Sequence, residues 1–317
     1  MIESFRALRR LGVLGINRRN IEFIREYNPR KLYPLVDDKL LTKKLALEAG
    51  LPVPDLFGVM STQHDIRDLS RVLEDRSEFV CKPAHGSGGN GVMVIKGRRG
   101  DIFYKSSGSP IDKEEISHHL SNMISGLYSL AGQRDHVMIE YCVRTAKPLL
   151  TMSYQGVPDI RLIVLLGYPV MAMVRLPTRL SDGRANLHQG AVGVGVDIAT
   201  GTTLGGVLEN RVVGEHPDTG QGLAGITLPE WDRMLKMAAM GYEITGLGYL
   251  GIDIVIDQKL GPLILELNAR PGLSVQIANK TGLEPRLRRI ESIAGESRSL
   301  ESRVAYCKEH FGVPLTN

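Results

Sequence analysis

Two neighbouring stretches near the carboxyl end, residues 251–257 and 261–268, constrain this chain more than any other feature. Read as β-strands, they place alternate side chains on opposite faces. In the second stretch one face carries Ile264, Glu266 and Asn268. A hairpin of the two strands brings Asp253 to the same side as Glu266 and Asn268. Oxygen donors of this kind suit a hard cation such as magnesium, although a solvated hairpin face that carries acids by chance has the same pattern.

Length and composition are those of a soluble globular protein. The 317 residues are 43% hydrophobic and 23% charged, which allows one large core or two to three smaller lobes. The net charge is +4, and much of it lies near the amino end, in Arg6, Arg9, Arg10, Arg18, Arg19, Arg25, Arg30 and Lys31. Such a basic arm is typical of contacts with nucleic acid, an anionic membrane or an acidic partner, and also of a solvated helix face.

Cysteine usage and apolar patterning favour a cytoplasmic protein. The three cysteines, Cys81, Cys142 and Cys307, are odd in number and far apart, so we expect free thiols in a reducing compartment. The longest apolar run, 162–174, is broken by a glycine and a proline. It is too short to span a membrane and predicts a hairpin. No secretory signal precedes it.

Periodicity predicts α+β lobes. Helices are expected within residues 1–30, at 38–49, from Thr62, at 112–128 and from Thr227; strands are expected at 79–82, 91–95, 101–104 and 136–143. The helix at 38–49 is expected to bury Leu41 and Leu45. Thr227 and Glu230 predict a capping box. We divide the chain into a basic helical arm (1–30), a main domain (31–290, with a lobe at about 79–143) and a helical tail (291–317).

A lysine-bearing strand, 80–83, runs into the glycine-rich segment 86–91. Glycines let backbone N–H groups approach phosphate oxygens, and Lys82 is a compact cationic donor. The segment is neither a Walker A motif nor a dinucleotide fingerprint. A hairpin turn with no ligand is the alternative.

Three further segments carry weaker signals. The strand at 137–143 could be a hinge whose backbone amide and carbonyl hydrogen-bond to an adenine edge. The alternative is an ordinary buried strand. Arg161 and Arg184 are candidates to hold carboxylate or phosphate oxygens, although surface arginines are common. His188 fits a structural role as well as a catalytic one.

Taken in order, these motifs resemble the ATP-grasp superfamily. The residues that carry the resemblance are Asp38-Lys39, Cys81-Lys-Pro83, the glycine segment, Ile139-Glu-Tyr-Cys142, Asp159-Ile-Arg161, Arg184-Ala-Asn-Leu-His-Gln-Gly190 and Glu266-Leu-Asn268. The similarity covers about residues 31–290. Within the superfamily, 186–190 and 261–272 most resemble the α-L-glutamate ligases, whose best-known member adds glutamates to a ribosomal protein tail.

The resemblance implies an ATP-grasp fold with ATP between two α+β lobes. It assigns the nucleotide to Lys39, Lys82, Ser87, Gly88, Gly89, Asn90, Gly91, Glu140, Tyr141, Asp159, Arg184 and Asn186. It assigns two magnesium ions, with manganese as an alternative, to Asp253, Glu266 and Asn268. Arg161 and Arg184 are the implied catalytic residues, which stabilise an acyl phosphate and the oxyanion formed from it.

The implied reaction is ATP-dependent amide-bond formation by a carbon–nitrogen ligase. A carboxylate, expected to be that of glutamate or a similar amino acid, attacks the γ-phosphate, and an amine, peptide or protein tail then displaces phosphate. The segment before Asp38 is shorter than the N-terminal domain usual in this branch, so a second copy of the chain or a protein partner is expected to complete the acceptor side. The glycine-rich stretch 201–227 reads either as a substrate-gating flap or as a long surface loop.

Two other functions remain open from the sequence. One is a nucleotide-binding regulatory subunit of the same fold without ligase turnover. The other is a basic module acting on nucleic acid, which we do not expect because the arm lacks interleaved aromatic residues.

Overall fold

The computed structural model describes residues 7–86, 88–129 and 132–313, which form two compact units. The larger unit comprises the described residues of Met1–Asp37, Leu45–Pro52 and Arg144–Asn317. The smaller unit comprises those of Asp38–Lys44 and Val53–Val143. Both units combine helices with antiparallel sheets, so the expected α+β class is confirmed.

The smaller unit is built on a six-stranded sheet with strand order β1-β6-β2-β3-β4-β5. Its strands are β1 (Leu56–Met60), β2 (Phe79–Pro83), β3 (Met93–Arg99), β4 (Ile102–Lys105), β5 (Pro110–Ile111) and β6 (Val137–Glu140). Its helices are the 3₁₀ helix η3 (Asp65–Asp68), α6 (Leu69–Val72) and α7 (Lys113–Ile124). The apolar face of α7 packs with β2 and β6 in one core, where the rings of Phe79 and Phe103 meet edge to face at 5.6 Å.

Helix α7 starts where its sequence predicts and ends earlier. Asp112 is the N-cap: its side chain accepts from the Glu115 amide, and the Glu115 side chain accepts from the Asp112 amide. The predicted end was residue 128. Gly126 instead has φ +89°, and a Cβ there would lie 2.2 Å from the Gln133 carbonyl oxygen. This left-handed glycine turns the chain out of the helix.

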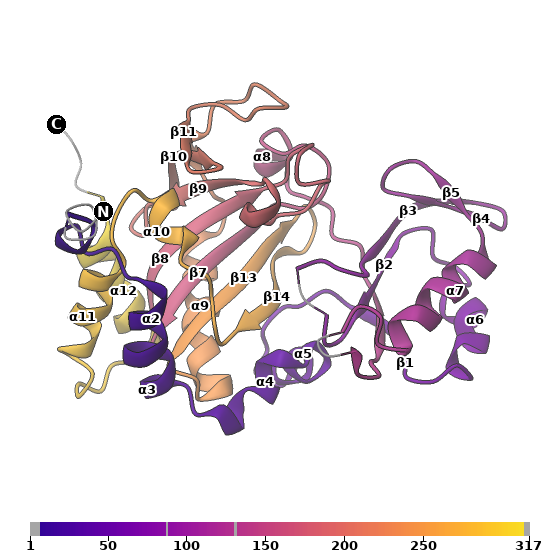
Figure 1. The fold of residues 1–317 in the computed structure, drawn as a ribbon, viewed down its shortest axis with the longest axis horizontal. Coiled ribbons are helices and arrows are strands. Elements are labelled where there is room, and N and C mark those ends of the chain that lie inside the picture. The colour runs from indigo at the N-terminus through magenta and orange to yellow at the C-terminus, as the bar shows by residue number, and fades with distance from the viewer. Residues whose placement is uncertain (1–6, 87, 130–131, 314–317) are drawn as a thin grey trace. The chain divides into compact units, whose positions relative to one another are not determined.

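The larger unit contains an eight-stranded sheet with the order β11-β10-β9-β8-β7-β13-β14, and β12 pairs with β10 (Figure 1). Its strands are β7 (Asp159–Leu165), β8 (Tyr168–Leu176), β9 (Val192–Val196), β10 (Thr202–Leu208), β11 (Arg211–Val213), β12 (Ala224–Thr227), β13 (Tyr249–Asp257) and β14 (Gly261–Asn268). The apolar run 162–174 thus forms the predicted hairpin, β7 and β8. Within the described ranges, no helix has both the length and the apolar character needed to cross a bilayer.

The helices of the larger unit lie around this sheet. They are α2 (Ile16–Arg18), the π-helix η1 (Arg19–Ile24), α3 (Arg25–Tyr27), the 3₁₀ helix η2 (Arg30–Leu32), α4 (Pro34–Asp37), α8 (Lys147–Leu150), the 3₁₀ helix η5 (Leu187–Gln189), α9 (Trp231–Thr245), α10 (Ser274–Ala278), α11 (Glu284–Glu291) and α12 (Leu300–Phe311). Helix α5 (Lys39–Glu48) contributes residues to both units. Gly241 of α9 lies directly against the Ile252 side chain, so α9 covers the Ile252 face of β13.

Two helix predictions need correction. Helix α9 begins at Trp231 without a capping box, because Thr227 ends β12 and the Glu230 side chain bonds to Arg233 instead. Helix α5 buries Thr42, Lys43 and Ala46, whereas Leu41 and Leu45 are only half-buried. In α5 the polar side chains of Thr42 and Lys43 are buried because they bond to other groups of the protein. A hydrophobicity pattern does not predict such bonds.

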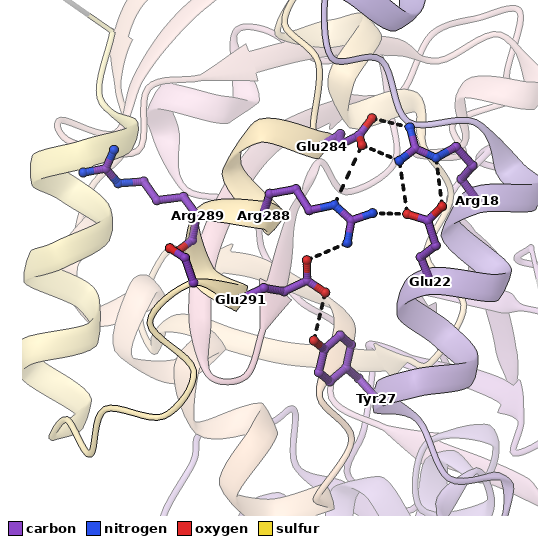
Figure 2. Close-up of polar contacts among 8 residues, drawn as sticks. Arg18, Glu22, Tyr27, Glu284, Arg288, Arg289 and Glu291 are labelled. Carbon is purple, nitrogen blue, oxygen red and sulfur yellow. Dashed lines mark hydrogen bonds and ion pairs between the residues drawn. The ribbon is translucent and has the colours of Figure 1, made fainter.

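The basic segment near the amino end packs against α11 through an ion-pair network (Figure 2). Its members are Arg18, Glu22, Tyr27, Glu284, Arg288 and Glu291. Burial and the hydrogen bond to Glu291 raise the pKa of Tyr27 to about 12. Phe23 and Ile24 of η1 are buried beside this network. Part of the positive charge in this segment is therefore neutralised inside the larger unit.

All three cysteines are buried and none forms a disulfide, as expected. Burial raises the pKa of the Cys81 and Cys307 thiols well above the ordinary value. These two thiols are therefore poor nucleophiles, and we assign them to the core.

Candidate functional site

One face of the larger sheet carries charged side chains from four neighbouring strands. In the strand register, Asp253 on β13 lies opposite Arg161 on β7 and opposite Glu266 on β14. Asp159, two residues before Arg161, pairs with Arg175 on β8. Paired residues of adjacent strands share a face, and so do residues two apart on one strand. These five side chains, which we call the charged row, therefore lie together opposite the face that α9 covers.

The predicted metal ligands share this face, but one detail of the hairpin was wrong. Asn268 lies two residues beyond Glu266 and pairs with Gly251, so it joins the charged row. The register then shifts, because Ile254 pairs with Ile264. Leu265 is the extra residue of a β-bulge, which turns Ile264 to the opposite face from Glu266. A simple alternation of residues does not reveal the insertion.

Asp253 is held by two arginines. Arg161 Nε donates to Asp253 Oδ1 at 2.7 Å, and Arg175 Nη2 donates to Asp253 Oδ2 at 2.7 Å. Arg175 also forms a bidentate pair with Asp159. The sequence reasoning did not identify Arg175. Its signal was available: it is the only charged residue in the apolar strand Tyr168–Leu176.

The two acids of this network respond differently to burial. Burial opposes ionisation of Asp253, but the adjacent Arg161 and Arg175 outweigh it and hold the pKa of Asp253 below its ordinary value. Burial, with the neighbouring charge of Asp253, raises the pKa of Asp159 to about 6 despite the contact with Arg175. Asp253 is thus the more firmly ionised of the pair.

The donor set fits magnesium rather than a cage built from protein alone. A carboxylate offers about four lone-pair sites, and the arginines fill three on Asp253, which leaves one on Oδ1. Glu266 and Asn268 are half-buried and add a carboxylate and an amide, although Asn268 Oδ1 also accepts from the Arg270 amide at 2.8 Å. Among the described residues, no three His, Cys, Asp or Glu side chains converge to hold a metal. Few protein ligands and several waters or phosphate oxygens are the usual shell of magnesium.

The smaller unit carries a second buried ionic cluster, in which one acid bonds to two lysines. Lys82 on β2 and Lys43 on α5 both pair with Glu140 on β6, the latter at 3.0 Å, and all three side chains are largely buried. Lys43 Nζ also donates to the Pro54 carbonyl. Burial lowers the pKa of Lys43 below its ordinary value. We call these residues the lysine trio; Lys43 was not singled out from the sequence.

The predicted nucleotide residues near the trio have definite positions. Glu140 directs its carboxylate to the lysines, and the Tyr141 amide donates to the Asp55 carbonyl at 2.8 Å. Lys39 Nζ donates to the carbonyl of Gly86, at the start of the glycine segment. Adenine contact by Glu140 and Tyr141 stays a prediction.

The glycine segment is a left-handed turn as far as it is described. Gly88, Gly89 and Gly91 have φ of 64°, 77° and 77°, a conformation that favours glycine. A Cβ on Gly91 would lie 2.6 Å from the Tyr128 ring. Asn90 is exposed within the turn. Ser87 lies outside the described residues.

Asp135 anchors the base of this segment, and the sequence analysis missed it. Its buried carboxylate accepts from the His85 amide, His85 Nδ1 (2.8 Å), the Ser129 hydroxyl and the His136 amide (2.7 Å). Burial opposes ionisation, but these donors outweigh it and lower the pKa of Asp135. The acid precedes β6 in a polar stretch, so only tertiary contact reveals its role.

Arg184, Asn186 and His188 lie on one irregular loop, 177–190, of the larger unit. Arg184 and His188 are exposed, and Asn186 caps η5 by accepting from the His188 amide at 3.0 Å. Leu187 packs over Gly193, where a Cβ would lie 2.6 Å from Leu187 Cδ2. Gly193 pairs with Arg175 across β8 and β9. The loop therefore lies on the same face as the charged row.

Comparison with known families agrees with these motifs. The sequence model of the sugar-transfer associated ATP-grasp family matches residues 18–292. The chain belongs to this family. The ATP-grasp membership expected from the motif order is thereby confirmed.

Individual relatives are distant. Ribosomal protein bS6–L-glutamate ligase of Salmonella paratyphi B is 26% identical over 247 residues, which are 78% of this chain and 60% of that protein. The chain thus spans 60% of the length of this relative. A D-alanine–D-alanine ligase from Bacillus anthracis, complexed with ATP, matches with a TM-score of 0.47 and 14% identity over 88% of this chain and 70% of its own. The ATP-grasp ligase PsnB, complexed with a minimal precursor, Mg and ADP, matches with a TM-score of 0.44 and 15% identity. The match covers 85% of this chain and 62% of that one.

Proposed function

We propose that this protein is an ATP- and magnesium-dependent carboxylate–amine ligase that forms an amide bond through an acyl phosphate. The observation that carries the proposal is the charged row: three acids and two arginines on one sheet face, with the amide of Asn268 beside them. The family membership supports the reaction class.

In this proposal each unit has its own binding role. The lysine trio and the glycine segment of the smaller unit, with Lys39, hold phosphate oxygens. Asp253, Glu266 and Asn268 of the larger unit hold magnesium. When bound, magnesium neutralises charge on the phosphate oxygens.

The protein's own groups mainly position the substrates and stabilise charge. Arg161 is oriented by its bond to Asp253, and Arg175 by its bidentate pair with Asp159. These fixed guanidinium groups, with Arg184 on the neighbouring loop, stabilise the negative charge that develops in both steps. A carboxylate attacks the γ-phosphate, which gives an acyl phosphate and releases ADP. An amine then attacks the acyl carbon, loses a proton and displaces phosphate. Groups oriented before the reaction need little rearrangement, which is the main source of rate in such transfers.

For the donor we propose an amino-acid carboxylate, with glutamate as the first candidate, because the curated relative is a glutamate ligase. The acceptor is an amine on a small molecule, a peptide or a protein tail. A partner protein or a second copy of this chain completes the acceptor side.

The test is ADP release by purified protein with ATP, magnesium and pools of amino acids and amines. The wild-type protein should release ADP with at least one pool, and ADP release should stop when EDTA removes the metal. Glu266→Gln should lower turnover by about 100-fold or more, as loss of one electrostatic stabiliser does, while exposed Glu301→Gln leaves it unchanged. If Glu266→Gln releases ADP as fast as wild type, the site assignment is wrong.

A regulatory subunit that binds nucleotide without turnover is the second candidate. One observation favours it: both oxygens of Asp253 already accept hydrogen bonds from arginines. Equilibrium binding of ATP with and without magnesium, measured beside the ADP assay, separates the two. Tight binding with no ADP from any pool would favour the regulator.

A further inference from the structure

The segment 214–223, inside the glycine-rich stretch 201–227, is an ordered turn. The His216 amide donates to the Gln221 carbonyl at 2.9 Å, and the Leu223 amide donates to the Gly214 carbonyl at 2.9 Å. The Leu223 side chain is fully buried and lies directly against Gly206 of β10. This turn is therefore fixed to the sheet at its base.

The same turn contacts the loop 177–190 through the buried His216 and through Asp218. The His216 side chain is 1% exposed, and its Nε2 lies 3.0 Å from the Pro177 carbonyl oxygen. The Asp218 amide donates to His216 Nδ1 at 3.2 Å, and the Asp218 carboxylate accepts from the Arg179 amide at 2.7 Å. A carbonyl can only accept and an amide can only donate, so the ring is the neutral tautomer that carries its proton on Nε2.

A hydrogen bond joins the two ends of this loop, and Arg184 in its middle is exposed. Thr178 Oγ1 donates to the Gly190 carbonyl at 2.7 Å, and the Thr178 amide donates to Ser181 Oγ at 2.9 Å. Between these ties lie Arg184 and Asn186, in a stretch with no strand of its own. Such a stretch relies on its anchors for a defined conformation.

We propose that the turn 214–223 is a positioning element, in which His216 and Asp218 hold the loop 177–190 so that Arg184 and Asn186 meet the anionic group of the carboxylate substrate. The proposal rests on the ligase function above and names the part of the site that the turn serves. Leu187 packs over Gly193, which pairs with Arg175, so the loop adjoins the charged row. A shift of the loop then moves Arg184 relative to that row.

The kinetic test compares variants of the anchor with a matched control. His216→Phe keeps a planar aromatic ring but removes both hydrogen bonds, and a misplaced catalytic group typically costs about 100-fold. We expect kcat/KM for the carboxylate substrate to fall by about 10- to 100-fold. His216→Gln, which can still donate to Pro177, should recover part of this loss. Gln221→Ala, an exposed side chain on the same turn, should match wild type.

A double-mutant cycle separates positioning from simple loss of stability. If His216 acts through Arg184, adding His216→Phe to Arg184→Ala should cost less than about threefold, because coupled residues are not additive. Equal losses from His216→Phe in the two backgrounds would overturn the proposal. So would a wild-type kcat/KM in His216→Phe.

A second readout does not depend on turnover. Trypsin cuts after Arg179 and Arg184, so limited digestion of the full chain reports the order of the loop. We expect His216→Phe and Asp218→Ala to be cut there at least tenfold faster than wild type, and Gln221→Ala at the wild-type rate. Unchanged cleavage in both anchor variants would overturn the positioning role. A protein that shows the cleavage effect but no ADP release would instead overturn the ligase function alone.

Discussion

The charged row and the lysine trio are both largely buried ionic clusters, but they differ in the sign of their charge. The row holds three acids, Asp159, Asp253 and Glu266, and two arginines. The trio holds one acid and two lysines. Counting formal charges, the row carries a surplus of one negative charge and the trio a surplus of one positive charge.

This contrast agrees with the ligand that the proposed function gives to each cluster. A buried charge without a partner is costly, so each surplus favours a ligand of opposite sign. Under the proposed function, the row binds a cation and the trio binds phosphate oxygens. The contrast also predicts that removing an acid has different consequences in the two clusters, because the trio has only one.

The largest effect is expected for Glu140→Gln. Both lysines lose their shared carboxylate while remaining buried, and breaking such a pair costs about 3–5 kcal/mol of the free energy of unfolding. Urea denaturation measures this, with exposed Glu74→Gln as the control, expected within about 0.5 kcal/mol of wild type. A loss below about 1 kcal/mol would mean that the trio is not a coupled unit.

A smaller effect is expected for Asp253→Asn. Asp159 and Glu266 remain near the two arginines after this substitution, so the arginines are not left without a counter-charge. The free energy of unfolding should therefore fall only by the contribution of hydrogen bonds to a charged group, about 1.5–3 kcal/mol. The pKa of Asp253 is lowered in the folded protein, so its ionised carboxylate stabilises the fold at pH values above the ordinary aspartate pKa. This stabilisation is lost as pH falls below about 4.

Urea denaturation of Asp253→Asn and wild type at neutral and acid pH measures both effects. Exposed Asp182→Asn, in the same unit, is the matched control. The comparison of the two clusters fails if Asp253→Asn destabilises the protein more than Glu140→Gln does.

The smallest change is expected for Lys43→Met. Lys82 still neutralises Glu140, and replacing a buried ammonium with an apolar side chain removes its desolvation cost, so the free energy of unfolding should change by less than about 1 kcal/mol.

The difference between wild type and Lys43→Met should depend on pH. Burial lowers the pKa of Lys43, so the folded protein loses this proton before the unfolded chain does as pH rises. Wild type should therefore gain stability relative to Lys43→Met as pH rises from about 7 to about 10, near the ordinary value of a lysine pKa. Urea denaturation at both pH values measures it, and a constant difference would contradict the assignment.

Local patterns predict how part of the candidate site is arranged. The alternation along 261–268 correctly put Glu266 and Asn268 on one face, because the pleat of a strand assigns side chains to faces. The same rule failed at Ile264, since the bulge at Leu265 arises from pairing with β13. Arg175 was missed because its partners, Asp159 and Asp253, come from other strands.

Sequence alone determined which candidate groups this protein carries: the acids and amide of the last hairpin, the lysine before the glycine segment, and the motif order of its family. Only the tertiary structure decided how these groups are held. Arg175, Lys43, Asp135 and His216 gain their roles from partners distant in sequence. The reason is physical: a strand or turn has a local periodicity that residues reveal, whereas a buried hydrogen bond depends on which segments meet.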